Sequence, residues 1–342
     1  MTHDVDVLVV GGGPIGLAAA IEARMLGLTA VVVEPREPGI DKACGEGLMP
    51  GAVPALARLG VVPEGYPIRG VAYQSSRRRA EHRFRSGHAL GVRRTVLSVT
   101  LSARAEAVGV VRLPARVESI SQDPSGVAAA GLRARYLLGA DGLHSTVREL
   151  VGLGVGVPPE GRRFGLRRHF LVAPWSDCIE VHWTRDVEAY VTPVAADTVG
   201  VAILGPVGTS FDAALATIPA LAERVAGGVP ASSLRGAGPF HQRTVRRSVG
   251  RVMLVGDASG YVDAITGEGI RVGLAQARAA IECISAARPG FYEREWMLRT
   301  RDFRLLTGGV VALGASAFRA GIVPAAVAFP RVFGGIVERL AR

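Results

Sequence analysis

The chain contains 342 residues, 49% of them hydrophobic, and carries a formal net charge of +10. This length allows a large core and about two domains, while three cysteines without metal-binding spacing argue against a disulfide framework or a metal site. The arginines are dispersed and lack a recognition helix or interleaved aromatic residues, so we expect no nucleic-acid partner. Scarce cysteine and strand-like sequence close to Met1 predict a cytoplasmic protein without a signal peptide.

The first 34 residues predict a βαβ unit. A strand over residues 4–10 leads into Gly11-Gly12-Gly13-Pro14-Ile15-Gly16, followed by a helix over 15–26 and a strand over 30–34. Glycine-rich backbone before a helix presents free N–H groups and the positive end of the helix dipole, which suits a diphosphate. Glu34, at the end of the second strand, can accept hydrogen bonds from a ribose. An NAD-binding module has the same fingerprint, so this unit alone leaves FAD and NAD open.

Two sets of predicted elements follow. The first comprises a helix over 51–59, a hairpin over 70–85, a helix over 93–107 and strands over 115–121 and 136–138. The second comprises alternating segments over 166–172, 178–183, 189–194 and 199–204, which predict an antiparallel sheet with one buried face. A strand over 252–255 and a long helix over 267–287 then return to the first part of the fold.

The C-terminal region is apolar but interrupted. Arg319, Pro324 and Arg331 divide the segment 305–337, which therefore lacks the about 20 consecutive apolar residues that a transmembrane helix needs. We expect amphipathic helices that pack over the second domain. Peripheral membrane contact is the alternative, because a helix that is apolar on one side can also lie in the bilayer interface, and a basic surface attracts anionic lipid.

Two further glycine motifs each follow a predicted strand. Gly139-Ala140-Asp141-Gly142 follows the strand over 136–138, and Gly256-Asp257-Ala258 follows the strand over 252–255. A simple nicotinamide dehydrogenase does not need these two motifs. Three such motifs in this order indicate one long dinucleotide that lies across a parallel sheet.

With these motifs the sequence resembles the flavoprotein hydroxylase superfamily. The segment 139–148 is similar to its D-G motif, and the segment 256–270 is similar to its G-D motif. Arg94-Thr95-Val96-Leu97 resembles the start of the helix whose arginine meets FAD. Cys44-Gly45-Glu46-Gly47-Leu48 points to the geranylgeranyl-reductase-like branch, whose relatives include flavin-dependent halogenases and hydroxylases.

The resemblance covers about residues 4–290 and implies a fold and a cofactor. The implied class is α/β, with a Rossmann-like domain that binds FAD noncovalently, an inserted antiparallel-sheet substrate domain and C-terminal helices, as in the para-hydroxybenzoate-hydroxylase fold. The FAD-binding domain would be discontinuous, over residues 1–70, 91–160 and 240–290. The substrate domain would comprise residues 71–90 and 161–239, and residues 291–342 would form a C-terminal helical region.

The resemblance also assigns contacts to the cofactor. Asp257 would bond a ribityl or diphosphate group, and Asp141 would brace the interdomain region. Gly267 and Gly269 would let the backbone approach the isoalloxazine ring, towards which the helix from Ile270 aims its dipole. The residues expected to contact FAD are Gly11, Gly13, Pro14, Ile15, Gly16, Glu34, Pro35, Arg36, Lys42, Cys44, Gly45, Arg94, Val117, Asp141, Gly142, Gly256, Asp257, Gly267, Glu268, Gly269 and Ile270.

The loop before the second predicted helix carries two reactive groups. In relatives this loop runs beside the flavin, so Cys44 would touch the ring or donate a proton to a reduced carbon. A thiol that only packs against the ring is the alternative. Lys42, the only lysine of the chain, would bind a diphosphate or an anionic substrate, or else pair with Asp41 or Glu46 at the surface.

Candidate acid–base groups of the second domain are His169, His182 and Tyr190. On a sheet that faces the flavin, one of them would deprotonate a phenol or protonate a carbon. A hydrogen-bonded structural role is the alternative for each histidine. Prenyl reductases of the resembled branch carry a Y-x-W-x-F-P signature, whereas Tyr190-Val191-Thr192-Pro193 lacks both the tryptophan and the phenylalanine.

Two reactions on a hydrophobic small molecule therefore stay open. In the first, NAD(P)H is a transient electron donor for FAD, and oxygen serves to hydroxylate an aromatic or polyketide-like substrate. In the second, reduced FAD passes hydride to an alkene of a prenyl chain, and Cys44 or a neighbouring acid completes protonation. The altered segment 190–193 favours hydroxylation. A non-catalytic protein that binds FAD or a nicotinamide cofactor is a third hypothesis, and the oligomeric state is open.

Overall fold

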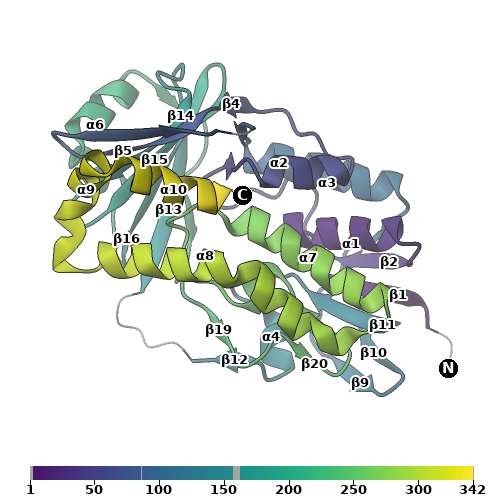
Figure 1. Ribbon diagram of the computed structural model, residues 1–342. Coiled ribbons are helices and arrows are strands. Elements are labelled where there is room, and N and C mark those ends of the chain that lie inside the picture. The colour runs from purple at the N-terminus through teal and green to yellow at the C-terminus, as the bar shows by residue number, and fades with distance from the viewer. Residues whose placement is uncertain (1–2, 86, 157–161, 342) are drawn as a thin grey trace.

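Two sheets organise the computed structural model, which describes residues 3–85, 87–156 and 162–341 (Figure 1). The first sheet has the order β20-β21-β11-β1-β2-β8, and the strands from β21 to β8 run parallel. The antiparallel strands β9 and β10 extend it from β11, and β20 pairs antiparallel with β21. The bounds are β1 Val5–Val10, β2 Ala30–Val33, β8 Val111–Leu113, β9 Ser121–Asp123, β10 Gly126–Ala129, β11 Leu132–Gly139, β20 Ser248–Val249 and β21 Val252–Leu254.

Both faces of this sheet are covered at its centre, which explains why the central strands β1, β2 and β21 are apolar almost throughout. Val7 and Val9 of β1 pack towards α1 and α7, whereas Leu8 and Val10 pack towards β10 and α4. Pro14 opens α1, where its missing N–H removes no helical hydrogen bond. The helices of this part are α1 Pro14–Met25, α2 Ala52–Arg58, α3 Arg94–Ala107, α4 Thr146–Leu150, the 3-10 turn η1 Gly256–Ser259 and α7 Gly269–Ser285.

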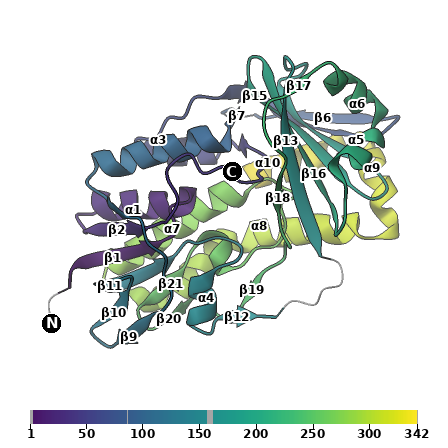
Figure 2. The ribbon, with the colours of Figure 1, turned by 180° about the vertical axis from the view of Figure 1, so that it is seen from behind.

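The second sheet has the order β17-β13-β16-β15-β14-β5-β6, with β18 beside β13 (Figure 2). All its pairs are antiparallel except β5 with β14. The strands β5 and β6 form the hairpin that leaves the first part of the fold, and β5 joins the sheet in the same direction as β14. One face packs under α5 Phe211–Ala216 and α6 Pro219–Ala226. The strands are β5 Gly70–Gln74, β6 Arg79–Arg83, β13 Arg163–Leu171, β14 Cys178–Trp183, β15 Glu188–Ala195, β16 Thr198–Pro206, β17 Val229–Pro230 and β18 Arg235–Ala237.

Two small sheets connect these parts. One has the order β3-β7-β4, with β3 Gly47–Leu48, β7 Ala89–Gly91 and β4 Tyr66–Ile68. The other pairs β12 Gly154–Val155 with β19 Arg243–Thr244. In the first of them, β3 follows directly after Glu46 and pairs with β7, and β7 contacts β15 of the second sheet.

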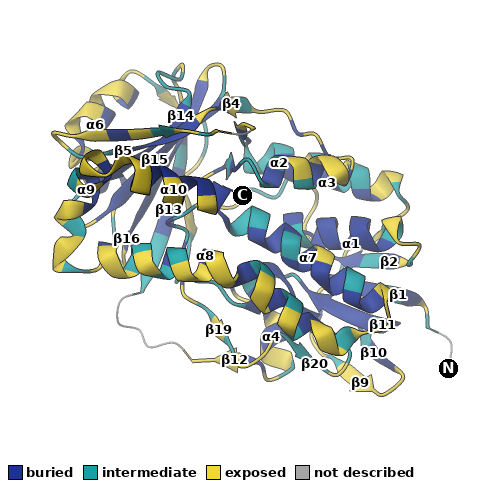
Figure 3. Ribbon diagram, viewed as in Figure 1, coloured by how far each residue is buried: buried dark blue, intermediate teal, exposed yellow. Residues whose placement is uncertain are grey.

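The C-terminal helices lie along the second sheet and carry much of the exposed surface in Figure 3. They are η2 Pro289–Phe291, α8 Tyr292–Gly314, η3 Ala317–Gly321, α9 Ile322–Ala328 and α10 Pro330–Ala341. The start of α8 packs on α7, whereas α9 contacts β5 and β6, and α10 contacts β6. Within the described ranges, no single helix has the length and apolar composition to span a bilayer; α8 and α9 meet that test only jointly, across a bend of 99°.

The predicted fold class is confirmed, and one predicted strand is wrong. The structure has no strand over 115–121: this segment is coil until β9 begins at Ser121. Pro114 lacks the N–H that a strand would need at that point, and β8, which ends at Leu113, already occupies the sheet edge beside β2. Val117 is nevertheless buried, because the coil packs beneath the first sheet.

Gly91 provides a test of how tightly the two parts of the fold meet. A Cβ atom at Gly91 would lie 1.6 Å from the carbonyl oxygen of Pro193 in β15. We therefore expect Gly91→Ala to lower the free energy of unfolding by about 1–3 kcal/mol, the usual cost of overpacking. A Cβ atom at Gly335 in α10 would meet no atom within 4 Å. Gly335→Ala should therefore raise the free energy of unfolding by about 0.5–1 kcal/mol, because alanine favours the helix more than glycine does. Denaturant titration of both variants checks the contrast, and equal effects would contradict it.

Candidate active site and cofactor cavity

A cavity of about 530 Å³ lies where the two sheets meet. Its lining joins the carboxyl ends of β1 and β11, the loop 40–47 and the start of α7 to one face of the second sheet. Ligands of open parallel sheets bind at such carboxyl ends. The cavity is therefore the candidate active site, and its two ends differ in chemistry.

The first glycine motif contains two kinds of glycine: two that the packing of the protein requires, and one that keeps space open beside the cavity. Gly11 has a φ of +107°, and a Cβ atom at Gly16 would lie 1.9 Å from the carbonyl oxygen of Gly11. A Cβ atom at Gly13 would meet only the guanidinium of Arg94, at 4.0 Å. Packing within the protein thus requires Gly11 and Gly16, whereas Gly13 keeps open a cradle at the N-terminus of α1 that suits a phosphate.

Glu34 lines this end of the cavity with an ionised carboxylate. Its carboxylate accepts hydrogen bonds from the backbone N–H of Gly12 at 2.9 Å and from Arg36 at 2.7 Å. Burial alone would raise the pKa of Glu34, but these hydrogen bonds and the charge of Arg36 lower it. An ionised carboxylate accepts several hydrogen bonds, so it can still receive those of a ribose.

Two cations line the cavity beside the glycine motifs. Neither Lys42 nor Arg94 has a carboxylate within 4.0 Å of its charged group in the part of the chain that the structure describes. The predicted surface pairing of Lys42 does not occur, because Asp41 is bound to Arg167 and Glu46 to His169. Two cations that face a cavity without partners fit a diphosphate.

Asp257 faces the same two cations across the cavity. Burial raises the pKa of Asp257, and the positive charges of Lys42 and Arg94 offset part of that rise. No side-chain hydrogen bond of Asp257 occurs among the described residues, which leaves its carboxyl group available to a polyol chain such as the ribityl chain of FAD.

Hydrogen bonds join the two later glycine motifs. Asp141 accepts a hydrogen bond through Oδ2 from the N–H of Val147 at 3.0 Å and so caps α4, while its buried Oδ1 has no partner in the described chain. Arg148 is buried and donates to the carbonyl oxygens of Leu143 and Ala258. This arginine therefore fixes the middle motif against the late one, a role that sequence analysis did not assign.

The start of α7 presents open backbone to the cavity. Gly267 has a φ of +69°, and a Cβ atom there would meet nothing within 4 Å; at Gly269 the nearest atom, of Tyr261, would be 3.8 Å away. Helix α7 points its N-terminus, and hence its positive dipole end, at this space. Glu268 lies outside the lining: it is buried and ion-paired with Arg271.

The opposite end of the cavity is apolar. Tyr73, Val181, Tyr190 and Ala202 are paired directly across β5, β14, β15 and β16, so they form one row on the cavity face of the second sheet. Other apolar side chains complete this wall; they are Val71, Ile179, Leu204, Phe240, Val337 and Leu340. A wall of this kind binds an apolar molecule and excludes water.

Tyr190 lies at the cavity, but its hydroxyl is engaged. It donates a hydrogen bond to the carbonyl oxygen of Ile265 at 2.8 Å. Burial raises the pKa of Tyr190 well above its ordinary value, and the charge of Glu188 adds to the effect. The phenol is therefore protonated at neutral pH and connects the second sheet to the segment before Gly267, rather than acting as a base.

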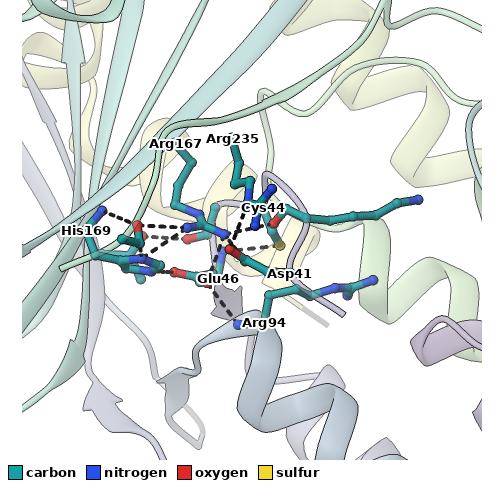
Figure 4. Close-up of polar contacts among 11 residues, drawn as sticks. Asp41, Cys44, Glu46, Arg94, Arg167, His169 and Arg235 are labelled. Atoms are coloured by element: carbon teal, nitrogen blue, oxygen red, sulfur yellow. Dashed lines mark hydrogen bonds and ion pairs between the residues drawn. The ribbon is translucent and has the colours of Figure 1, made fainter. Parts of the chain in front are cut away.

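His169 is a structural member of a buried polar cluster, drawn in Figure 4. Its Nε2 lies 2.5 Å from Oε2 of Glu46, and its Nδ1 lies 2.9 Å from the hydroxyl of Ser232. The buried Arg167 extends the cluster to Asp41. Arg94 donates its backbone N–H to Oε1 of Glu46 at 2.9 Å, while its side chain points away from the cluster (Figure 4).

His182 faces away from the cavity. Val181 lines the cavity, and successive side chains of a strand point to opposite faces, so His182 lies on the far face of β14. There its Nε2 lies 3.5 Å from Glu180, which Arg79 also contacts. The structure thus brings neither histidine to the substrate wall.

Cys44 lies in the lining beside Glu46. Its sulfur accepts a hydrogen bond from the N–H of Glu46 at 3.4 Å. Burial raises the pKa of the Cys44 thiol, and the positive charge of Arg94 offsets part of that rise. A protonated thiol is a poor nucleophile, which fits a packing or proton-donating role.

Most of the predicted cofactor residues line the cavity. The exceptions are Gly16, Pro35, Val117 and Glu268. Sequence analysis missed three residues of the lining that bear on chemistry, namely Tyr73, Arg167 and Tyr261. Strand alternation with Val71 is the one signal that could have indicated Tyr73.

Comparison with known proteins agrees with this geometry. Residues 4–290 match the model of a family described as FAD binding domain. The chain belongs to this family. The matched region contains all three glycine motifs, Lys42, Arg94 and the start of α7, so the family model and the cavity lining coincide.

Relatives and solved structures differ in what they do. The chain is 28% identical over 296 residues to a dialkyldecalin synthase of Streptomyces rugosporus, covering 79% of this chain and 63% of that protein. It is 33% identical over 171 residues to a rifampicin monooxygenase of Streptomyces venezuelae, covering 46% and 36%. It thus spans less than two thirds of either relative. The fold matches p-nitrophenol 4-monooxygenase of Pseudomonas putida with a TM-score of 0.81 at 19% identity, over 100% and 99% of the chains.

Filling the cradle at Gly13 should abolish cofactor binding without unfolding the protein. Gly13 has extended backbone angles, φ −72° and ψ 174°, that any residue adopts, and space for a side chain exists. We expect Gly13→Val to purify folded but colourless. Gly309→Val, at an exposed position of α8 with no atom within 4 Å, is the matched control and should stay yellow. Visible absorbance and circular dichroism decide; retained flavin in Gly13→Val would contradict the assignment.

The buried carboxyl group of Glu268, just before α7, makes the free energy of unfolding depend on pH. Burial raises the pKa of Glu268 from 4.5 to about 7, against the charge of Arg271. Between these values the folded state holds a proton that the unfolded state releases, so the free energy of unfolding falls as pH rises from about 4.5 to about 7. Glu268→Gln removes this contribution.

The free energy of unfolding of Glu268→Gln relative to the unsubstituted protein should therefore increase through that window and level off above it. Urea titrations at pH 4, 6 and 8 measure the difference, and the pH 4 value is the internal reference because both side chains are then neutral. A constant difference at all three values would refute the account.

Proposed function

We propose that the protein is an FAD-dependent monooxygenase that hydroxylates an apolar aromatic or polyketide-like molecule. The observation that carries the proposal is the division of one cavity into a phosphate-binding end and a wall of paired apolar side chains. FAD, when bound, supplies the oxygen-activating redox chemistry. The family of the chain and the monooxygenase among its relatives support this class of reaction.

The residues of the chain would contribute positioning and exclusion of water. The row from Tyr73 to Ala202 orients an aromatic ring by contact, and the absence of ionised groups from this row keeps the wall dry. Burial raises the pKa of Tyr73 to about 12, so its phenol can donate a hydrogen bond to a substrate oxygen at neutral pH. Tyr73 is therefore a better candidate for substrate contact than the two predicted histidines.

Reduction of a prenyl double bond is the second candidate function. Cys44 supports it, since a thiol kept protonated beside the cofactor end can deliver a proton to carbon. The cavity wall at Tyr190 and Thr192 lacks the tryptophan and phenylalanine of the prenyl-reductase signature. This difference favours hydroxylation.

NAD(P)H is the electron donor that we propose. A second pocket of about 190 Å³ shares Asp257 and Gly269 with the FAD cavity. Arg247 and Arg304 both lie over the ring of Trp296 there, at 4.0 and 5.1 Å from its centroid. Burial and the charge of Arg247 lower the pKa of Arg304. Arg247 already pairs with Glu293 at 2.8 Å, so Arg304 is the guanidinium group that an anionic donor would meet as it approaches the flavin.

Ala202 allows a test of the apolar wall. We expect the purified protein to oxidise NAD(P)H faster with an alkyl phenol and to form a product heavier by one oxygen atom. Ala202→Leu fills the wall, so it should raise KM for the phenol about tenfold while the flavin spectrum and the substrate-free oxidation rate persist.

Ala222→Leu, on the half-buried side of α6, is the matched control and should leave KM unchanged. Saturation of a prenyl substrate under anaerobic conditions, without any oxygenated product, would establish the reductase instead. Bound FAD that no NAD(P)H or chemical donor reduces would refute both reactions.

A further inference from the structure

The C-terminal helices carry a large exposed apolar surface. Its members are spaced over α8, η3, α9 and α10, and four of them are more than half exposed: Leu305 at 66%, Phe318 at 74%, Phe329 at 64% and Val332 at 60%. Between residues 305 and 336 the other exposed large apolar residues are Leu313, Val327 and Ile336, whereas the exposed Met297 and Leu298 lie earlier in α8 and are outside this set. We call this set the C-terminal apolar surface. Apolar groups that gather on one face, rather than occurring singly, mark an interaction site.

Helix α10 shows that this exposure is not a by-product of core packing. Phe333 and Val337 point inward, whereas Val332 and Ile336 are exposed on its outer side. The inner side already forms the core and, through Val337, part of the cavity wall. The outer side therefore contributes nothing to the described core and needs a different explanation.

Within the segment that carries this surface the charges have one sign, and Asp302, just before it, is paired with Arg339. The segment 303–337 contains no aspartate or glutamate, and its charged residues are Arg304, Arg319 and Arg331. Arg319 is engaged, since it pairs with Glu188 and donates to the carbonyl oxygen of Thr184, and so fixes η3 on the second sheet. Arg331 is exposed and has no carboxylate within 4.0 Å among residues 3–85, 87–156 and 162–341.

The β5–β6 hairpin adds two more free cations at the same end of the molecule. Helix α9 packs on β5 and β6, and both views show this hairpin at the same end of the molecule as α9 (Figures 1 and 2). Arg77 and Arg78 occupy this tip; they are exposed, and their guanidinium groups make no ion pair within the described ranges.

We propose that the C-terminal apolar surface docks on an anionic lipid bilayer. Phe318, Phe329 and Val332 would enter the interface between headgroups and acyl chains, and Arg77, Arg78 and Arg331 would contact anionic headgroups. A second copy of the chain fits less well, because two such surfaces would bring arginines together without an acidic partner. The bilayer supplies the missing negative charge.

This docking would place the outer side of α10 in lipid and its inner side on the substrate wall. An apolar substrate, on the function proposed above, would then reach the cavity past Val337 without crossing bulk water. The docking itself does not depend on which reaction the protein catalyses, so its test is separate from the test of activity.

Vesicle cosedimentation of the FAD-loaded full chain tests the proposal. We expect it to pellet with vesicles of phosphatidylcholine and phosphatidylglycerol, less with phosphatidylcholine alone, and less at about 0.5 M than at about 0.1 M salt. Phe318→Ser with Phe329→Ser should lower the partition coefficient at least about tenfold, because two large apolar side chains are lost. Arg77→Glu with Arg78→Glu should remove the preference for anionic vesicles.

The matched control is Val62→Ser with Val245→Ser, which removes two side chains that are 76% and 61% exposed on other parts of the surface. It should bind as the unsubstituted protein does, and retained flavin absorbance confirms that every variant is folded. Equal binding of the control and the phenylalanine variant would overturn the proposal. So would a dimer in solution that the phenylalanine variant loses while neither protein binds vesicles, since the occupant would then be a second copy.

Discussion

A single buried carboxylate, that of Glu46, fixes the loop 40–47 against the second sheet. It accepts hydrogen bonds from the backbone of Arg94 at the start of α3 and contacts His169 of β13 at 2.5 Å. Glu46 adopts a φ of +58°, which is costly for a residue other than glycine and persists only where the surroundings determine it. An ionisable group so deeply buried must be hydrogen-bonded, so loop, helix and strand have little freedom to move apart.

The geometry of the cavity follows from that connection. Thr192 donates to the carbonyl oxygen of Gly45 at 2.8 Å, and Tyr190 donates to that of Ile265 at 2.8 Å, so β15 holds both the loop and the segment before α7. The polar end thus meets the apolar wall along one strand. The polar end and the apolar wall can be adjacent because uncharged hydrogen bonds, rather than exposed ion pairs, form the boundary between them.

Local patterns predicted the central strands β1, β2, β11 and β21 of the first sheet, the main strands of the antiparallel sheet and most of the glycine-rich cavity lining, because glycine turns and strand alternation depend on neighbouring residues; the outer strands β8, β9, β10 and β20 were missed. The polar cluster could not be predicted in the same way: Glu46 and His169 are 123 positions apart, and only the fold brings them together. His182 failed for a subtler reason. Its strand was predicted, but which of its two faces meets the cavity depends on pairing with β5 and β15, which no local pattern specifies.

Helix α10 connects the two properties that distinguish this chain, an apolar cavity and an apolar exterior. Val337 and Leu340 line the cavity, Glu338 accepts hydrogen bonds from the N–H of Arg85 and contacts His82, and Val332 faces outward. The Glu338 contacts anchor the helix to His82 of β6 and to Arg85, two residues beyond the end of β6, without using either apolar side. A short helix can therefore present one apolar side to the cavity and the other to its surroundings, because the polar contacts of Glu338, Arg339 and the Ala341 carbonyl oxygen hold it without using either apolar side.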